Sequence, residues 1–338
     1  MSSSSKGTNV YVGNSLHPTL VEEVRKALPD VSVKELRTHG RTVVEEDAKD
    51  AKQNAEILFG DSFLFKDVHE YEQLKWIQLK QAGVDFIIKQ FNEKNNLPFL
   101  LTRINTNALF IGEYVLSYIL ALERKLFILH DNQKQKVWTS KFETKLATRL
   151  ISNLTICILG VGNLGKEVAK RCKGLGMNVY GVTRTTYKEE HKSVYVDQYS
   201  TIAELSTVIT TCDYICCCLP STPETRGLLS GDVLKVCSDK KPILINCGRG
   251  DLINEATIVK AIQEKWLGGA VLDVIEREPL PSDSLLWDLP NVYITPHVSG
   301  YNTDQYNVKN IVEIFVENYR RYCDNKPLKL QVNLDAGY

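Results

Sequence analysis

The sequence predicts an α/β protein made of two domains, each with a doubly wound parallel sheet. Its 338 residues exceed what one ordinary hydrophobic core accommodates, so two domains are expected. Short apolar runs alternate with segments of helical pattern along most of the chain, as in βαβ units. One of these runs leads directly into the glycine-rich turn Gly160–Gly165 and a helical segment, which is typical of a dinucleotide-binding domain.

The composition argues against several classes of function. Hydrophobic residues at 43% and charged residues at 24% are globular values. Lys plus Arg and Asp plus Glu are both 41, so the zero net charge offers no electrostatic basis for binding nucleic acid or an anionic membrane. The Ser-rich start lacks the apolar core of a secretory signal. No apolar run approaches the ~20 residues of a membrane span.

The nine cysteines favour free thiols in a reducing compartment, which we expect to be the cytoplasm. Their number is odd, and no pair of Cys-x-x-Cys motifs occurs. Three of them, Cys216–Cys218, are consecutive in an apolar run, where neighbouring side chains alternate between the two faces of a strand. We therefore expect these thiols not to converge on a metal ion, and we predict no metal site.

The first part of the chain reads as a small open α/β unit. Its last expected strands flank the loop Gln81-Ala82-Gly83-Val84-Asp85. The expected strands are Asn9–Val12, Val31–Val33, Glu56–Phe59, Leu74–Leu79 and Leu97–Leu101, and the expected helices are Pro18–Leu28 and Glu45–Asn54.

A long apolar helix then separates the two halves. Residues Asn107–Arg124 have too few polar positions for a surface helix, so we interpret them as a connector into the second domain. The charged segment Asp131–Lys145, which carries Trp138, is expected to form an arm that could embrace a second subunit.

The glycine-rich turn opens the second domain. A buried strand is expected at Leu154–Leu159 and a helix at Glu167–Cys172. Gly160 permits the tight turn, Gly162 lets a pyrophosphate approach the backbone, and Gly165 lets the helix and strand pack closely. The free N–H groups and partial positive charge of the helix N-terminus then favour phosphate binding.

Five further strands complete this domain, with the ligand expected at their carboxyl ends. A last helix, Asn302–Cys323, is expected to return to the first domain. The first domain is therefore predicted as residues 1–106 plus 298–338, and the second as 107–297. The five strands are Met177–Val182, Tyr214–Leu219, Ile243–Asn246, Gly269–Leu272 and Val292–Ile294, with a helix at Ala256–Lys265.

Three of these strand ends carry residues suited to hydride-transfer chemistry. Arg249 offers a planar fork that matches a carboxylate. Glu278 offers a carboxylate, and a histidine paired with one, here His297, is a proton donor with a raised pKa. Taken alone, a lone Arg is more often a surface charge and a lone His a structural hydrogen-bonding group. Their shared placement after the glycine turn favours catalysis.

Seven motifs follow one another along nearly the whole chain: Ala82–Asp85, Gly112–Val115, Gly160–Gly165, Leu219–Thr225, Ile245–Gly250, Leu272–Val274 with Glu278–Pro281, and Thr295–His297. In this order they resemble the motifs of the D-isomer-specific 2-hydroxyacid dehydrogenases. The resemblance implies two domains, Rossmann-like and flavodoxin-like, with a cleft between them, usually in a homodimer.

The same resemblance implies roles for individual residues. Arg249 would bind the substrate carboxylate and polarise its carbonyl, His297 would be the acid-base, and Glu278 would hold His297 protonated and oriented. Backbone groups of Ala82, Gly83 and Val84 would bind the carboxylate from the other domain. The predicted cofactor contacts are Gly160, Gly162, Asn163, Leu164, Gly165, Thr183, Arg184, Thr185, Leu219, Pro220, Thr225, Cys247, Gly248, Arg249, Asp273, His297 and Gly300, with Asp273 at the nicotinamide amide and Leu219-Pro220 on the adenine side.

One departure from the NAD pattern bears on the cofactor. NAD-selective domains carry an acidic residue at the end of the second strand, where this chain has Thr183-Arg184-Thr185. An Arg there accommodates a 2′-phosphate, so we expect NADP to be preferred, with NAD possible; alternatively, Arg184 stacks on adenine without selecting. The preference fits the reductase branch that reduces glyoxylate and hydroxypyruvate to D-2-hydroxyacids.

Other activities on this fold fit less well. The chain lacks room for the regulatory domains of long phosphoglycerate dehydrogenases, and Glu278 with a short first domain argues against formate dehydrogenase. The alternative from another class is a dinucleotide-sensing, corepressor-like scaffold, which would leave the Arg, Glu and His set inert. We therefore predict a 2-ketoacid reductase with small-molecule substrates.

Overall fold

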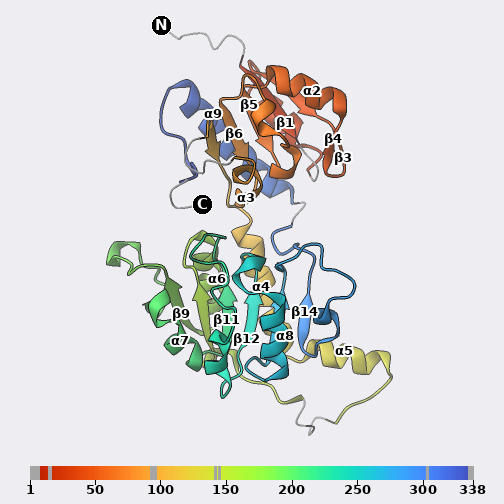
Figure 1. The fold of residues 1–338 in the computed structure, drawn as a ribbon, viewed down its shortest axis with the longest axis vertical. Helices are drawn as coiled ribbons and strands as arrows, with labels where there is room; N and C mark the ends of the chain where they lie inside the picture. The colour runs from red at the N-terminus through yellow and green to blue at the C-terminus, as the bar shows by residue number, and fades with distance from the viewer. Residues whose placement is uncertain are drawn as a thin grey trace. The chain divides into compact units, whose positions relative to one another are not determined.

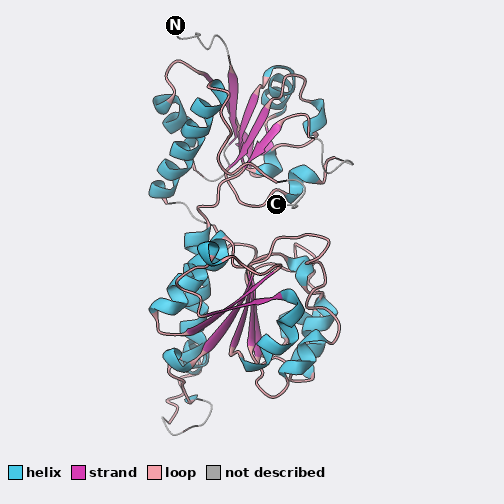
Figure 2. Ribbon diagram, turned by 90° about the vertical axis from the view of Figure 1, so that its left-hand side faces the viewer, coloured by secondary structure: helices cyan, strands magenta, loops and turns pink. Residues whose placement is uncertain are grey.

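The structure, a computed structural model, describes residues 8–13, 17–91, 97–140, 143, 146–301 and 304–333. The chain divides into two compact units, the first Met1–Asn107 with Asn302–Tyr338 and the second Ala108–Tyr301 (Figure 1). The boundaries expected from the sequence lay at 106/107 and 297/298. Helices cover both faces of the sheet in each unit (Figure 2).

The first unit is built on a five-stranded parallel sheet with the order β2-β1-β5-β6-β7. Counted along the chain, this is the flavodoxin-like order 2-1-3-4-5. The strands are β1 (Asn9–Gly13), β2 (Ser32–Leu36), β5 (Ile57–Gly60), β6 (Trp76–Leu79) and β7 (Leu100–Thr102).

The last helix of the chain completes the core of this first unit, as expected from the sequence. Helix α9 (Gln305–Cys323) packs with α1 (Leu20–Ala27) on one face of the sheet. Phe315 of α9 stacks on Phe59 of β5 with ring centroids 4.2 Å apart, and Trp76 stacks on Phe315 at 5.4 Å. A separate apolar cluster fills the other face and includes Ala51 of α2 (Glu45–Asn54) and Ile87 of α3 (Asp85–Ile88).

The second unit contains a seven-stranded parallel sheet with the order β10-β9-β8-β11-β12-β13-β14. Along the chain this reads 3-2-1-4-5-6-7, the Rossmann order, in which the direction of winding reverses between β8 and β11. The strands are β8 (Thr155–Leu159), β9 (Asn178–Thr183), β10 (Gln198–Thr201), β11 (Tyr214–Cys217), β12 (Ile243–Asn246), β13 (Gly269–Leu272) and β14 (Val292–Ile294).

Apolar clusters cover both faces of this second sheet. On one face, the connector helix α4 (Ala108–Glu123) packs with α6 (Asn163–Gly174) over β8 and β11. On the other face, α7 (Leu205–Val208) and α8 (Glu255–Gln263) contribute to the core. The alternation of side chains along β11 sends Cys216 to the first face and Cys217 to the second.

Several elements differ from those expected. Residues Leu126–Lys134 form helix α5, so the start of the predicted arm is helical; residues 141–142 and 144–145 of that arm lie outside the described residues. The strand expected at Leu97–Leu101 begins only at Leu100, because Pro98 cannot donate a ladder hydrogen bond. The short edge strand β10 and the two-residue strands β3 (Thr38–His39) and β4 (Thr42–Val43) were not predicted.

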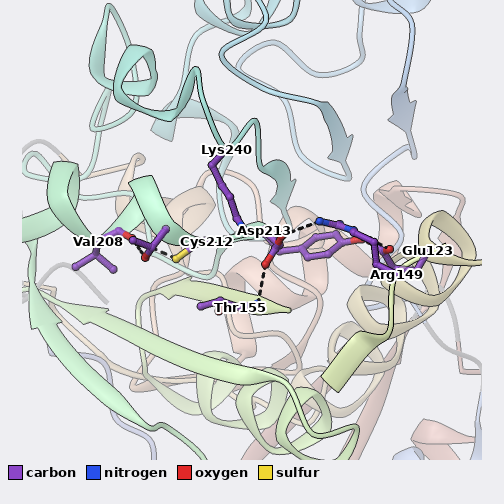
Figure 3. Close-up of polar contacts among 9 residues, drawn as sticks. Glu123, Arg149, Thr155, Val208, Cys212, Asp213 and Lys240 are labelled. Atoms are coloured by element: carbon purple, nitrogen blue, oxygen red, sulfur yellow. Dashed lines mark hydrogen bonds and ion pairs between the residues drawn. The ribbon is translucent and has the colours of Figure 1, made fainter. Parts of the chain in front are cut away.

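An ionic cluster built on the buried carboxylates of Glu123 and Asp213 ties α4 to the amino ends of β8 and β11 (Figure 3). Arg149 donates to both Glu123, at 2.5 and 3.1 Å, and Asp213, at 2.6 Å. Asp213 also accepts from the backbone N–H of Thr155 at 2.9 Å and pairs with Lys240 at 3.0 Å. Burial of Glu123 raises its pKa, but hydrogen bonds from Arg149 and Tyr214 outweigh this effect and lower it overall.

Within the described ranges, none of the helices has the length and apolar composition that crossing a bilayer would require.

Candidate active site

The glycine turn lies at the switch point of the second sheet, between β8 and α6. Gly160 has φ 94°, which glycine adopts without strain, as expected for the tight turn. A Cβ on Gly165 would lie 2.0 Å from the carbonyl oxygen of Gly160, so only glycine lets the helix approach this closely. Gly162 is exposed, and an added Cβ would meet no atom within 4 Å.

The loop after β14 holds His297 in an uncommon backbone conformation. Its φ of 56° lies in the left-handed region, which few residues other than glycine occupy and which is frequent at functional sites. The backbone N–H of His297 donates to the carbonyl oxygens of Thr295 and Asp273, both at 2.9 Å. The loop geometry therefore fixes the position from which the imidazole projects.

His297 and Glu278 form a close pair. The imidazole Nδ1 lies 2.8 Å from Oε2 of Glu278, and Oε1 of the same carboxylate accepts from the backbone N–H of Ile275 at 3.0 Å. The hydrogen bond with Glu278 raises the pKa of His297 above its usual value, although burial and the nearby Arg249 act in the opposite direction. With Nδ1 engaged, Nε2 is the ring nitrogen that can donate a proton to a ligand.

Arg249 lies near this pair and is held through its backbone. The charge of Arg249 lowers the pKa of both His297 and Glu278, which places the guanidinium in the same electrostatic environment. Asn246, at the end of β12, donates to the carbonyl oxygen of Arg249 at 3.1 Å and accepts from the N–H of Gly248 at 3.3 Å. The second unit alone thus brings together the three predicted catalytic residues.

Asp273 organises the loop that carries His297. Its carboxylate is buried and accepts from the hydroxyl of Thr295 at 2.7 Å and from the N–H groups of Val298 and Ser299 at 2.8 and 2.9 Å. Thr295 in turn is 2.7 Å from the hydroxyl of Tyr114 on α4. The contacts of Asp273 in the structure are therefore internal, and its predicted contact with the cofactor stays a prediction.

Sequence reasoning did not assign roles to Asn246, Thr295 and Tyr114. The available signal was position: Asn246 ends a predicted strand, and Thr295 directly precedes the Pro-His pair. No sequence spacing pointed to Tyr114, because its contact with Thr295 joins residues 181 positions apart.

The loops after β9 and β11 carry further predicted cofactor residues, whereas Cys247 and Gly248 follow β12 and Gly300 follows β14. Thr225 is buried, and its hydroxyl donates to the carbonyl oxygen of Pro220 at 2.6 Å while accepting from the N–H of Thr222 at 2.8 Å. Leu219 packs against Gly160, because a Cβ on that glycine would lie 2.9 Å from its methyl group. Thr225 therefore shapes the loop through its internal hydrogen bonds.

At the end of β9, Thr183 is buried and Arg184 is exposed. The Thr183 hydroxyl donates to the carbonyl oxygen of Thr185 at 2.7 Å, which closes a tight turn. Among the residues that the structure describes, the Arg184 guanidinium has no hydrogen-bond or ion-pair partner.

In the first unit, Ala82, Gly83 and Val84 follow β6, at the carboxyl edge of its sheet. Arg103 donates to the carbonyl oxygen of Ala82 at 3.2 Å. Just before this loop, the buried Lys80 pairs with the buried Asp61 at 3.0 Å. Arg103, which follows β7, thus contacts the loop directly, and the Lys80–Asp61 pair joins the ends of β6 and β5 just before it.

The second unit fits a dinucleotide. The pyrophosphate needs a close approach to backbone N–H groups at a helix N-terminus, and the exposed Gly162 at the start of α6 leaves that space open.

Comparison with known proteins agrees with this geometry. Residues 116–299 match the family model of the D-isomer specific 2-hydroxyacid dehydrogenase NAD binding domain. The chain belongs to this dehydrogenase family. It is therefore an NAD(P)-dependent oxidoreductase that interconverts 2-ketoacids and 2-hydroxyacids, with a dinucleotide-binding domain in its second unit.

Members of the 2-hydroxyacid dehydrogenase family resemble the chain over most of its length. Glyoxylate/hydroxypyruvate reductase B from Serratia proteamaculans is 28% identical over 293 residues, which are 84% of this chain and 88% of the relative. A solved family protein from Aeromonas salmonicida has a TM-score of 0.81 at 30% identity, covering 97% of this chain and all of that one. An NADPH-dependent glyoxylate/hydroxypyruvate reductase from Sinorhizobium meliloti, solved with NADP and sulfate, has a TM-score of 0.80 at 26% identity and covers 98% of this chain and all of that one. All three are named as reductases or as a dehydrogenase family protein, and none supports the corepressor-like alternative.

Proposed function

We propose that this dehydrogenase reduces glyoxylate, hydroxypyruvate or a similarly small 2-ketoacid to the D-2-hydroxyacid, with NADPH as the preferred reductant. The observation that carries the proposal is the 2.8 Å contact between His297 and Glu278 beside Arg249, at the carboxyl edge of a Rossmann sheet. Relatives named for reduction of glyoxylate and hydroxypyruvate support the choice of substrate.

Each catalytic residue has a distinct task in this proposal. The guanidinium of Arg249 binds the substrate carboxylate through two parallel hydrogen bonds and polarises the neighbouring carbonyl. His297, whose pKa is raised by the hydrogen bond with Glu278, donates a proton from Nε2 to the carbonyl oxygen in its protonated form. The bound nicotinamide supplies the hydride that reaches the carbonyl carbon. Glu278 keeps the imidazole oriented and stabilises its charge.

Further residues are proposed to position the two ligands. Backbone groups of Ala82, Gly83 and Val84 contact the substrate carboxylate. The turn Gly160–Gly165, with Gly162, Asn163 and Leu164, holds the pyrophosphate. We propose the other cofactor contacts at Thr183, Arg184, Thr185, Leu219, Pro220, Thr225, Cys247, Gly248, Asp273 and Gly300.

The preference for NADPH rests on the end of β9. A carboxylate at this position would accept hydrogen bonds from the ribose hydroxyls and repel a 2′-phosphate. This chain has the uncharged Thr183 followed by the exposed Arg184, which reverses both effects. Solved relatives with NADP bound support the choice of NADPH. The alternative is that Arg184 only stacks on adenine, in which case it would not discriminate between NADPH and NADH.

We also propose that the enzyme is a cytoplasmic homodimer. All nine cysteines are free thiols, which suits a reducing compartment. Trp138 lies four residues after the end of α5 and is 99% exposed. Tryptophan is enriched at protein–protein interfaces, so a fully exposed tryptophan side chain favours an interface at this position.

The activity is tested by following NADPH oxidation with glyoxylate and with hydroxypyruvate as substrates. We expect turnover with a small 2-ketoacid, a D-configured product, and a loss of about 10²- to 10⁴-fold in kcat for His297→Asn, the usual scale of acid-base catalysis. Cofactor binding, measured by NADPH fluorescence, should be nearly unchanged in that variant. Near-normal turnover without His297 would remove it from the mechanism.

A further inference from the structure

Three thiols of the second unit converge beside the glycine turn, and none of them takes part in the proposed proton or hydride transfer, although Cys247 is also a proposed cofactor contact. Cys216 and Cys218 are two residues apart along β11 and its extension, so their side chains point to the same face of the sheet. Cys247 follows the neighbouring strand β12, whose register sets Asn246 beside Cys217. The three Sγ atoms all lie within 4.8 Å of one another.

This convergence corrects an expectation from the sequence. Alternation along the strand does exclude Cys217, which packs into the cluster on the opposite face. It does not exclude residues two apart, and the third thiol comes from a different strand that sequence spacing could not place.

The distances suit a bound metal ion. The Sγ atoms of Cys216 and Cys218 are 3.8 Å apart, close to the separation of about 3.8 Å that two thiolates have around a tetrahedral ion with bonds of about 2.3 Å. The point in the plane of the three sulfurs that is equidistant from them lies between about 2 and 2.6 Å from each Sγ atom, a range that includes the Zn–S bond length of about 2.3 Å. A disulfide between Cys216 and Cys218 is disfavoured, because residues two apart on a strand have Cα atoms about 6.6 Å apart, near the upper limit for that bond.

The surroundings select a soft cation. Cys216 and Cys247 are buried, whereas Cys218 is partly exposed and offers a route for entry. Within the described residues, the group of ligands that could share one ion contains sulfur only, with no carboxylate or imidazole. Ca²⁺ and Mg²⁺ require oxygen ligands, whereas thiolates favour Zn²⁺ and similar ions.

We propose that Cys216, Cys218 and Cys247 bind one thiophilic divalent ion of the Zn²⁺ or Cd²⁺ type. Each thiol loses its proton to solvent as its sulfur bonds to the metal, so one ion releases three protons and retains an open position for water. This proposal concerns the thiols alone and does not depend on the proposed substrate.

The test titrates the reduced, chelator-treated full-length protein with Cd²⁺ and follows the thiolate-to-cadmium charge-transfer absorption. All variants carry Cys323→Ser, which removes an exposed thiol. We expect saturation at one ion per chain, with release of protons and a higher melting temperature. Cys218→Ser and Cys216→Ala should each weaken binding at least about tenfold. The matched control is Cys217→Ser, buried in the same strand on the other face, which should bind like its parent.

Two results would overturn the proposal. The first is the absence of saturable charge-transfer absorption in a protein whose thiols are shown to be reduced. The second is equal binding in Cys217→Ser and Cys218→Ser, which would place the cadmium elsewhere. Because Cys218 is only partly buried, its variant is expected to fold, and its melting curve without metal checks this directly.

Discussion

At the scale of single residues, the proposed mechanism makes Glu278 the residue that sets the pH range over which His297 donates a proton. The hydrogen bond with Glu278 raises the pKa of His297 above the usual 6.5, so the imidazole stays protonated further into the neutral range. Reduction of a ketoacid needs that protonated form. The rate of reduction should therefore be high below the raised pKa and fall as pH rises through it.

Glu278→Gln should shift this alkaline limb to lower pH. The substitution keeps the side-chain size and a hydrogen-bond acceptor but removes the charge, so the pKa of His297 should drop toward 6.5 or below, while the nearby Arg249 continues to lower it. The measurement is kcat/KM for glyoxylate as a function of pH. Glu276→Gln, in the same loop, is the control. An unmoved alkaline limb in Glu278→Gln would contradict the assignment of His297 as proton donor.

Arg184 is the residue on which the proposed preference for NADPH depends. A charge-assisted hydrogen bond to a phosphate contributes about 1.5–3 kcal/mol, or roughly tenfold or more in affinity. Arg184→Ala should therefore lower kcat/KM for NADPH by about that factor and leave NADH nearly unchanged. Lys188→Ala removes an exposed charge four residues further on and serves as the control. Equal losses for both cofactors would mean that Arg184 only stacks on adenine.

The three proposed catalytic residues could be singled out because each lies in a short motif after a strand, Arg249 and His297 three residues beyond the strand end and Glu278 six residues beyond it. Their roles came from the family resemblance and stay a proposal, while the structure places the imidazole of His297 2.8 Å from Glu278. The residues that hold them were not predictable in the same way. The bond between Tyr114 and Thr295 depends on how α4 packs on the sheet, which local sequence does not encode.

At the scale of elements, the ionic cluster at the amino ends of β8 and β11 anchors the connector helix. Glu123 is the last residue of α4 and is almost fully buried, with Arg149 and Tyr214 both donating to it. Its lowered pKa means that it contributes to stability above the usual carboxyl pKa of 4.5, and that this contribution is lost as pH falls through the lowered value.

Glu123→Gln should therefore destabilise the second unit at neutral pH. Glu123 is buried, but Arg149 is about half exposed and keeps its hydrogen bond with Asp213, so the loss is expected to be that of hydrogen bonds to a charged group, about 1.5–3 kcal/mol. The midpoint of urea unfolding at pH 7 should fall, and the difference from wild type should shrink in acid. Glu23→Gln breaks an exposed pair with Lys26 and should change stability by less than about 1 kcal/mol. Similar midpoints for the two variants would show that the cluster does not anchor α4.

Elements with strong apolar periodicity were predicted closely, whereas short and polar ones were missed. Strands β12, β13 and β14 begin and end at the expected residues, because each is a continuous apolar run between turn residues. Strand β10 was missed because Gln198–Thr201 is polar. It lies at the edge of the sheet, where a strand is less buried and does not require the continuous apolar run that identifies a central strand. Helix α5 was missed because its charged second half resembles a solvated arm.

At the scale of the whole molecule, the segment after α5 is the best candidate for subunit association. Val137 is 48% exposed and Trp138 is 99% exposed, and both follow Lys134, where α5 ends. Covering adjacent exposed apolar side chains with a second chain removes their surface from water and so favours association. Single exposed apolar side chains, by contrast, are common on monomeric proteins and do not indicate an interface. The two-unit division itself was readable from the sequence, since α4 and α9 are its two longest helices and lie just after the boundaries.

Trp138→Ala should weaken the proposed homodimer. A buried tryptophan at the centre of an interface contributes about 2 kcal/mol or more, or roughly thirtyfold in Kd. Light scattering after size-exclusion chromatography should give a dimer for the wild type and, on dilution of the variant, a mass approaching the 38.2 kDa of a single chain. Trp287→Ala removes another exposed tryptophan, one whose indole already bonds to Pro281, and should leave the mass unchanged. A wild-type protein that is monomeric at micromolar concentration would end the proposal, and a variant that dissociates no more readily than wild type would move the interface away from Trp138.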